Sequence, residues 1–384
     1  MKIAHIIIAD SYREGWGYQQ NILPVKHMDL GHKVYIIAKP VPGHSLGGEE
    51  YVNKDGLNVS ILNSNKSRKT TPVINLFYNI TIGLYCKLEE IAPDVIFIHG
   101  LQAIDNLAVC KYKKKHPDVK VYVDQHGDYY NMPITPLKNR LIQKLFFKRI
   151  AKRLEKISEK MWGVTPWRVH YLQNVYNISP DKTGLLVMGG DEKLIDLEHK
   201  DAIRTKIRKA HNIPEDAFLI ITGGKIDRVK NIHLLIEAFN KMGREDAHLI
   251  IFGNYNDEME KVCKPMFNER ITDIGWLNSN DVYPYFLAAD LAVFPGTHSV
   301  LWEQVCAAGL PAIFKDWNGG MNHVDVGGNC VLLNDVTVDI IKDTVLNILE
   351  NKNVYSKMKE VAGTTGKKTF SYIEIAKKSI GMIL

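Results

Sequence analysis

The chain has 384 residues, of which 45% are hydrophobic and 24% are charged, and its formal net charge is +6. This length exceeds the roughly 100–200 residues of a usual single domain, so two globular domains are expected. No stretch approaches the ~20 apolar residues that would span a bilayer, and the first ten residues are typical of a buried strand rather than a signal peptide. The five scattered cysteines indicate a reducing compartment and exclude a structural zinc site of the Cys-x-x-Cys type. We therefore expect a soluble, cytoplasmic protein.

The charge is concentrated in the first half of the chain. Residues 1–197 hold 27 Lys and Arg against 19 Asp and Glu, whereas the remainder is slightly acidic. Such a basic half indicates an anionic partner, which is either nucleic acid or an anionic membrane surface.

Short apolar runs alternate with longer segments of helical periodicity along the whole chain. Most of these runs are continuously apolar, which is typical of strands buried on both faces of a parallel sheet. The predicted strands are Ile3–Ile8, Val34–Ala38, Val95–His99, Val119–Asp124, Met161–Val164, Leu185–Met188, Phe218–Thr222, His248–Phe252, Leu291–Phe294, Ala312–Phe314 and Val331–Leu333.

Helices are predicted between the strands, for example over Asn231–Met242 and Ser279–Ala289. Alternating strands and helices predict an α/β fold with two doubly wound, Rossmann-like domains. The segment 192–200 is dense in charge and has no strand pattern, so we place the boundary there. The predicted domains are 1–195, 196–366 and a C-terminal helix, 367–384, that packs back on the first domain. Ligands are expected beyond the carboxyl ends of the strands.

Two loops of the first domain follow predicted strands. Gly15, Trp16 and Gly17 form a glycine loop that fits an acceptor or diphosphate contact, although the full dinucleotide fingerprint is absent. His126 comes two residues after the strand that ends at Asp124. It is either a hydrogen-bonding group for a sugar hydroxyl or a histidine satisfied by local backbone.

The segment 137–160 is strongly basic and has leucine, isoleucine and phenylalanine at helical spacing. A basic amphipathic helix is typical of membrane-surface binding. The alternative is an ordinary helix that packs Leu141, Leu145, Ile150 and Leu154 on its sheet, and both interpretations are compatible. Lys66, Arg68, Lys69 and Lys113–Lys115 add to the positive field.

In the second domain, a loop with two lysines follows the strand that ends at Thr222. Gly223 and Gly224 allow backbone amides to approach a ligand, and Lys225 and Lys230 lie in the same strand-to-helix connection. Two ammonium groups that converge in this setting favour a diphosphate site over a solvated turn.

A second loop follows the strand that ends at Phe294. Its Pro-Gly turn leads into a helix, which Ser299 or Thr297 is expected to cap. Backbone amides near residues 296–300 would favour an anion, and Glu303 lies one turn into the helix, where it can accept hydrogen bonds from hydroxyl groups. The chain has neither an Asp-x-Asp pair nor a His-Glu-x-x-His spacing, so a donor site without metal is expected.

Together these two loops resemble the family 4 retaining glycosyltransferases, the group 1 glycosyltransferases of bacterial polysaccharide biosynthesis, which have the GT-B fold of two Rossmann-like domains facing a cleft. Gly224, Lys225 and Lys230 resemble the diphosphate clamp of that family, with lysine in place of arginine. Gly275 and Trp276 resemble its nucleobase loop. By this resemblance Glu303 binds the donor ribose, and Gly189–Asp191 form the inter-domain turn. The donor-binding residues are then Gly224, Lys225, Lys230, Gly275, Trp276, Gly296, Ser299, Val300, Leu301 and Glu303.

The sequence departs from this family at one position. The family has a first glutamate eight residues before the second, where this chain has Pro295. His298 then becomes the candidate that contacts the donor sugar or its phosphate, unless it belongs only to the start of the helix. The resemblance also implies that His126 reaches the donor sugar. The candidate catalytic residues are His126, Lys230 and His298.

The resemblance implies a hexosyltransferase that moves a sugar from a UDP- or GDP-linked donor to a glycan or lipid-linked acceptor, with retention and without metal or other cofactor. Its cytoplasmic site would lie at the inner face of the cell membrane. The alternative is a nucleotide-sugar epimerase of the GT-B fold, which would use the same clamp without an acceptor. Nucleic-acid binding is disfavoured because aromatic-rich RNA motifs are absent.

Overall fold

The computed structural model describes residues 1–41, 47–64 and 81–383. The basic residues Lys66, Arg68 and Lys69 lie outside this described part. The chain divides into two compact units: unit 1 comprises Met1–Val187 and Ile375–Leu384, and unit 2 comprises Met188–Glu374. The boundary expected at 195/196 lies within unit 2, and the chain returns to unit 1 at residue 375, inside the last helix, α16 (Tyr372–Ser379). In the described part of the chain, no helix is long and apolar enough to cross a membrane.

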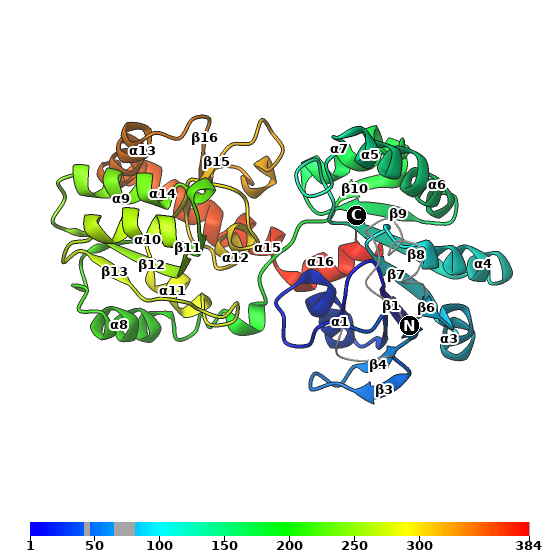
Figure 1. Ribbon diagram of the computed structural model, residues 1–384. Coiled ribbons are helices and arrows are strands. Elements are labelled where there is room, and N and C mark those ends of the chain that lie inside the picture. Colours follow the sequence, from blue (N-terminus) through cyan, green and yellow to red (C-terminus); the bar gives the residue numbers. More distant parts are fainter. Residues whose placement is uncertain (42–46, 65–80, 384) are drawn as a thin grey trace. The chain divides into compact units, whose positions relative to one another are not determined.

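Unit 1 is built on an eight-stranded sheet with the order β10-β9-β8-β7-β1-β2-β4-β3 (Figure 1). All neighbouring strands are parallel except β3 and β4. The strands are β1 (Lys2–Ile7), β2 (Lys33–Ala38), β3 (Glu49–Val52), β4 (Asn58–Ile61), β7 (Val95–His99), β8 (Lys120–Gln125), β9 (Lys160–Gly163) and β10 (Thr183–Leu185). A separate two-stranded sheet pairs β5 (Asn63–Ser64) with β6 (Thr81–Ile82).

Helices cover both faces of this sheet, as the continuous apolar strands predict. Along β1, Ala4 and Ile6 belong to one buried cluster, and Ile7 belongs to another that includes Val25 and Met28 of α1 (Gln19–Asp29). Successive side chains of a strand point to opposite faces, so burial of both sets requires a helix layer on each side. The other helices of the unit are α3 (Leu84–Ile91), α4 (Leu107–Lys115), α5 (Leu137–Leu141), α6 (Lys148–Glu155) and α7 (Pro166–Asn174).

Unit 2 has a six-stranded parallel sheet with the order β13-β12-β11-β14-β15-β16. The strands are β11 (Phe218–Ile226), β12 (Ala247–Tyr255), β13 (Ile271–Asp273), β14 (Leu291–Phe294), β15 (Ala312–Lys315) and β16 (Cys330–Leu333). The helices are α8 (Lys200–Ala210), α9 (Ile232–Lys241), α10 (Asp257–Cys263), α11 (Tyr283–Ala288), α12 (Leu301–Ala307), α13 (Val338–Glu350), α14 (Lys352–Val361) and α15 (Lys367–Thr369).

The prediction of two doubly wound sheets is confirmed, with local corrections. The strand expected over Leu185–Met188 occurs earlier, as β10. Strands β3, β4, β5, β6 and β13 were not predicted, because they are two to four residues long and lack a continuous apolar run. The helix expected over Ser279–Ala289 is shorter, since Pro284 lies at its first turn, where a missing N–H is tolerated.

The basic segment 137–160 does not form one uniform helix. Helix α5 leads into a π-helical stretch, Ile142–Phe147, and then into α6, while Lys160 already begins β9. Ile150 and Leu154 are buried as expected, but Leu141 and Leu145 are about half exposed, at 48% and 50%. The expectation that all four apolar residues pack on the sheet is therefore wrong for the first two. A π-helical stretch changes the angular spacing of side chains, so the apolar positions before and after it no longer share one face.

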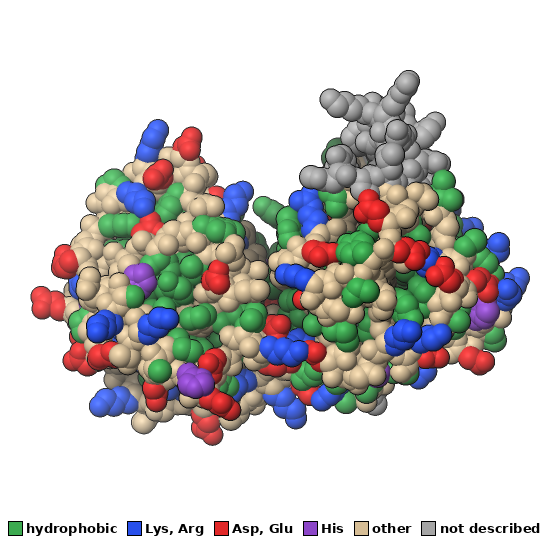
Figure 2. Space-filling view, turned by 90° about the horizontal axis from the view of Figure 1, so that it is seen from below, with side chains coloured by type: hydrophobic (Ala, Val, Ile, Leu, Met, Phe, Trp, Pro, Cys, Tyr) green, Lys and Arg blue, Asp and Glu red, His purple; other side chains and the backbone are tan. Residues whose placement is uncertain are grey.

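On the face shown in Figure 2, lysine and arginine side chains are interspersed with aspartate and glutamate over both units. The basic excess of the first half is therefore not gathered on that face.

Candidate active site

The two loops that the sequence singled out in the second domain are joined by hydrogen bonds in unit 2. The backbone N–H of Thr297 donates to the carbonyl of Val229 at 3.1 Å. The Nζ of Lys230 donates to the carbonyl of Thr297 at 2.7 Å, and Nδ2 of Asn231 donates to the carbonyl of Pro295 at 3.1 Å. The loop after β11 and the loop after β14 thus form one continuous surface at the carboxyl edge of the sheet.

Gly296 makes this close approach possible. A Cβ atom at this position would lie only 2.3 Å from the Cα of Lys230, which real side chains do not tolerate. Glycine is thus required here by backbone proximity rather than by an unusual φ angle. A Cβ atom on Gly224 would lie 3.1 Å from Cδ1 of Leu301, so the start of α12 also packs against the β11 loop.

The two lysines of the predicted clamp differ in their surroundings. Lys225 has a side chain that is 77% exposed and lies 3.7 Å from a carboxylate oxygen of Asp227. Lys230 is half-buried and held by backbone carbonyls, and burial lowers the pKa of its ammonium group to about 8. Lys230 is therefore the fixed cation of this loop, whereas Lys225 reaches into solvent.

Glu303 is fully buried and is held by two histidines. Its Oε1 atom accepts hydrogen bonds from Nε2 of His298 at 2.8 Å and from Nε2 of His323 at 2.9 Å. Its Oε2 atom is buried and has no hydrogen-bond partner. Burial opposes ionisation of this carboxyl, but the two histidines outweigh that effect and lower the pKa of Glu303 to about 2. The carboxylate is therefore ionised and has one oxygen without a hydrogen bond.

His323 was not predicted from the sequence. It lies in a 3₁₀ turn, Asn322–Val324, that follows β15, and it is 20 residues from Glu303 along the chain. Its Nδ1 atom is also buried without a partner. The rule that residues after a buried strand line the site would have identified it, because Gly319 and Gly320 after β15 form a glycine loop like the two recognised ones.

The cap expected at the start of α12 is absent. The helix begins at Leu301, Val300 is the cap residue, and no side chain caps it. Val300 has helical backbone angles, φ −56° and ψ −19°, whereas a capping serine or threonine needs an extended backbone. Ser299 contributes its carbonyl instead, which accepts from the N–H of Trp302 at 3.0 Å.

The predicted nucleobase loop lies beside the same sheet edge. Gly253 of β12 is the register partner of Gly224, and its N–H donates to the carbonyl of Gly275 at 2.7 Å. Gly275 has a φ of +69°, which favours glycine. Trp276 follows it with an indole that is 58% exposed.

The remaining predicted residues belong to unit 1. Trp16 is 42% exposed, with Arg13 stacked on its ring at 4.8 Å and Tyr18 edge-on at 5.0 Å. Gly15 has a φ of +75° and Gly17 is half-buried in the same loop. His126 follows β8, and its Nε2 atom lies 3.2 Å from Oδ2 of the buried Asp124.

Comparison with known proteins decides the class of the second unit. Residues 203–365 match the family model of glycosyl transferases group 1. The match covers most of unit 2, and the predicted resemblance to this group of glycosyltransferases is thereby confirmed. No curated protein matches the chain.

Solved structures of glycosyltransferases share the fold of the whole chain. A glycosyltransferase from Rickettsia africae is 16% identical, with a TM-score of 0.70 over 99% of this chain and 97% of that one. Sucrose-phosphate synthase from Thermosynechococcus elongatus is 14% identical, with a TM-score of 0.68 over 98% and 96%. HepE from Anabaena, in complex with UDP and glucose, is 14% identical, with a TM-score of 0.63 over 98% of each chain. The expected GT-B fold is thereby confirmed.

Proposed function

We propose that this enzyme transfers a sugar from a nucleoside-diphosphate sugar to a glycan or lipid-linked acceptor, with retention and without a metal ion at the donor site. The observation that carries the proposal is the unpartnered Oε2 of Glu303, buried beside a loop that presents Lys230. A buried acceptor atom without a donor costs free energy. A ribose hydroxyl that donates to it would remove that cost, and the resemblance of Glu303 to the ribose-binding glutamate of the family 4 glycosyltransferases supports the same pairing.

The chemistry of the loops fits a diphosphate leaving group. Breaking the sugar–diphosphate bond leaves negative charge on the diphosphate, which Lys225 and Lys230 would stabilise electrostatically. His298 is tied to Glu303 at the edge of the same loop and would contact the sugar or its phosphate. His126 of unit 1 would bind a hydroxyl of the sugar.

UDP is the first nucleotide to test, since HepE is known in complexes with UDP and UDP-glucose. A thermal-shift series with UDP-sugars and GDP-sugars should show stabilisation by one nucleoside diphosphate. Ligand at a hundredfold its Kd stabilises a protein by about 2.7 kcal/mol, which corresponds to a rise of roughly 5–10 °C for a unit of this size.

The variant Lys230→Ala should lose this shift, and Lys241→Ala is its matched control. Lys241 lies on α9 in the same unit, pairs with Glu237 on the surface and is remote from the loops. No stabilisation of the unaltered protein by any nucleoside diphosphate would refute the donor site. An equal loss of the thermal shift in Lys230→Ala and Lys241→Ala would show that the net charge, rather than the position of Lys230, governs nucleotide binding.

An epimerase would bind the same donor, so binding alone does not separate the two activities. A transferase releases nucleoside diphosphate only when an acceptor is present, whereas an epimerase interconverts the nucleotide sugar without one. Product analysis with and without a membrane glycolipid extract distinguishes them. The match of unit 2 to group 1 glycosyl transferases favours transfer.

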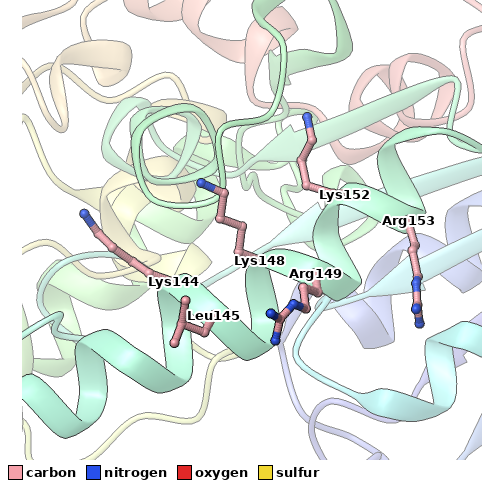
Figure 3. Close-up of a pocket in the computed structure, with 6 residues that line it drawn as sticks. All are labelled: Lys144, Leu145, Lys148, Arg149, Lys152 and Arg153. Atoms are coloured by element: carbon pink, nitrogen blue, oxygen red, sulfur yellow. The ribbon is translucent and has the colours of Figure 1, made fainter.

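The lipid-linked acceptor is supported by the surface of the basic segment. Figure 3 shows the side chains of Lys144, Lys148 and Lys152 on the helix with Arg149 and Arg153, and the half-exposed Leu145 lies among them. Exposed leucine beside lysine and arginine is the pattern by which a helix lies in an anionic membrane surface. We therefore place the enzyme at such a surface when it acts.

Vesicle co-sedimentation tests this attachment. Binding should occur with phosphatidylglycerol vesicles and not with pure phosphatidylcholine. The double variant Leu141→Gln, Leu145→Gln should bind about thirtyfold more weakly, because each half-exposed leucine contributes about 1 kcal/mol on burial and about 1.4 kcal/mol is a factor of ten. Ile340→Gln on α13, a residue 37% exposed in unit 2, is the control and should leave binding unchanged. Equal binding to both kinds of vesicle would contradict the proposal.

A further inference from the structure

Glu303 occupies a position from which a glutamate ordinarily serves its own helix. Helix α12 begins at Leu301 with Val300 as its cap residue, so Glu303 is the third helical residue. A glutamate at this position commonly turns back and accepts a hydrogen bond from the N–H of the cap residue. Here, in contrast, Oε1 contacts two histidines and Oε2 has no hydrogen-bond partner. Groups outside helix α12 therefore direct this carboxylate.

The two histidines fill one oxygen of the carboxylate. Nε2 of His298 lies 2.8 Å and Nε2 of His323 lies 2.9 Å from Oε1. Because an ionised carboxylate can only accept hydrogen bonds, both Nε2 atoms must carry the hydrogen that they share with Oε1. An oxygen of this kind accepts about two such bonds, so Oε1 is saturated. The remaining capacity of Glu303 for a ligand lies on Oε2 alone.

The two histidines reach Glu303 from different parts of the chain. His298 lies in the loop between β14 and α12, and its side chain is 8% exposed. His323 comes from the 3₁₀ turn after β15, and its side chain is 1% exposed. His298 can therefore contact a ligand itself, whereas the enclosed ring of His323 acts on a ligand through the carboxylate.

The turn that carries His323 is fixed against helix α12. The neighbouring Val324 is 0% exposed, and its carbonyl accepts from Nδ2 of the buried Asn329 at 2.9 Å. Sγ of Cys306, on α12, donates to the same carbonyl at 3.7 Å. Nδ1 of His323 is buried without a partner, so among the described residues the hydrogen bond of this ring goes to Glu303. An imidazole held in this way fixes the place of Oε1.

We propose that His323 is a positioning residue for the donor: together with His298 it holds Oε1 of Glu303, so that Oε2 alone meets a ribose hydroxyl. This inference rests on the donor site proposed above. Hydrogen bonds to a charged group are stronger than neutral ones, so the two histidines keep the carboxylate in one orientation. A site built to bind a hydroxyl rejects an analogue without it, because a buried polar atom is then left unpaired. His323 therefore sets how sharply the enzyme distinguishes ribonucleotides from deoxyribonucleotides.

Binding of deoxynucleotides to the full-length protein tests this role. Isothermal titration calorimetry compares UDP with 2′-deoxy-UDP and 3′-deoxy-UDP, or GDP with its deoxy forms if the thermal-shift series selects GDP. The unaltered protein should bind UDP about tenfold or more tightly than at least one of the two deoxy analogues, which is the effect expected for one hydrogen bond to a charged group. This affinity ratio, rather than the affinity for UDP, is the quantity to follow.

Two substitutions that differ by one methylene group separate the hydrogen bond from the shape of the side chain. His323→Asn should lower the ratio to about threefold or less, because its short amide does not reach Oε1 from the turn. His323→Gln should restore most of the ratio, since its amide nitrogen reaches the place of Nε2. His248→Asn is the matched control and should leave the ratio unchanged. His248 is a half-buried histidine at the amino end of β12, opposite the edge that carries the loops.

Circular dichroism of each variant checks that the chain is folded. If His323→Asn does not fold, His323→Phe replaces it, because phenylalanine fills the space of the imidazole without a donor. The same loss of the ratio is expected from this variant.

A merely structural role of His323 would weaken the binding of UDP and of its deoxy analogues alike. An unchanged ratio in His323→Asn therefore contradicts the inference, while UDP binding by the unaltered protein keeps the donor site. An equal loss of the ratio in His323→Gln and His323→Asn also contradicts it, since the donated hydrogen bond would then not matter. If the unaltered protein binds UDP and both deoxy analogues equally, Oε2 takes no ribose hydroxyl and the inference is wrong. Absence of nucleotide binding altogether refutes the donor site itself.

Discussion

Among the residues that the structure describes, two groups of two histidines and a carboxylate occur, one in each unit, and they differ in what surrounds them. In unit 1, Nε2 of His99 is hydrogen-bonded to His5, and Oδ1 of Asp124 accepts from the N–H of Gly100. In unit 2, Oε2 of Glu303 and Nδ1 of His323 are buried and have no hydrogen-bond partner. The same residue types thus form a carboxylate with both oxygens in contact with a donor in unit 1, whereas in unit 2 one carboxylate oxygen has no hydrogen-bond partner. The neighbouring groups, rather than the residue types, make this difference.

The largest effect expected from this comparison concerns the charge of Glu303. A carboxyl whose folded pKa is below its unfolded value stabilises the protein above the unfolded pKa. For Glu303 this stability is lost as the pH falls from the ordinary 4.5 to about 2. It amounts to about 3 kcal/mol, at 1.36 kcal/mol per pKa unit.

Urea unfolding of the unaltered protein and of Glu303→Gln measures this loss. The variant should be less stable by about 3 kcal/mol at pH 7, since it leaves two buried histidines without their shared carboxylate. The difference between the two proteins should shrink as the pH falls toward 2. If the difference in free energy of unfolding stays constant over this range, the two histidines do not stabilise the ionised form of Glu303.

An intermediate effect is expected at the glycine that joins the two loops of unit 2. Gly296→Ala places a Cβ against the backbone of Lys230, and overpacking of this kind costs about 1–3 kcal/mol. Gly363→Ala is the control, because a Cβ there meets nothing within 4 Å. Chemical denaturation should show a loss only at Gly296, accompanied by weaker nucleotide binding. If Gly296→Ala is destabilised but binds the nucleotide as before, the contact between the two loops does not form part of the nucleotide site.

The smallest effect concerns the pH dependence of donor binding. Burial lowers the pKa of Lys230 to about 8, so the charged form that attracts a diphosphate is lost as the pH rises through that value. Between pH 7 and pH 9 the affinity for a nucleoside diphosphate should fall about tenfold, which is about 1.4 kcal/mol. Isothermal titration calorimetry at a series of pH values measures it. In Lys230→Arg, which stays charged over this range, the decline should disappear.

Much of the fold was predictable, because buried parallel strands are continuous apolar runs and this signal is local. Strands such as β11 and β14, and the loops that follow them, were located within a few residues. Short polar strands such as β3 were missed, since their pairing depends on a neighbour. The absence of a cap at Ser299 was also not predictable, because the backbone angles of Val300 arise from the packing of the loop.

The sequence by itself determined the two doubly wound sheets and the Lys225–Lys230 and Glu303 motifs, because each depends on residues close together in the chain. Only the tertiary structure decided which side chains meet. Glu303 and His323 are 20 residues apart, and His99 and Asp124 are 25 apart, yet each pair is in hydrogen-bond contact. In unit 1 the register of β7 and β8 makes His99 and Asp124 partners. Parallel strands end at the same edge of a sheet, so their pairing order assembles a site that no spacing in the sequence records.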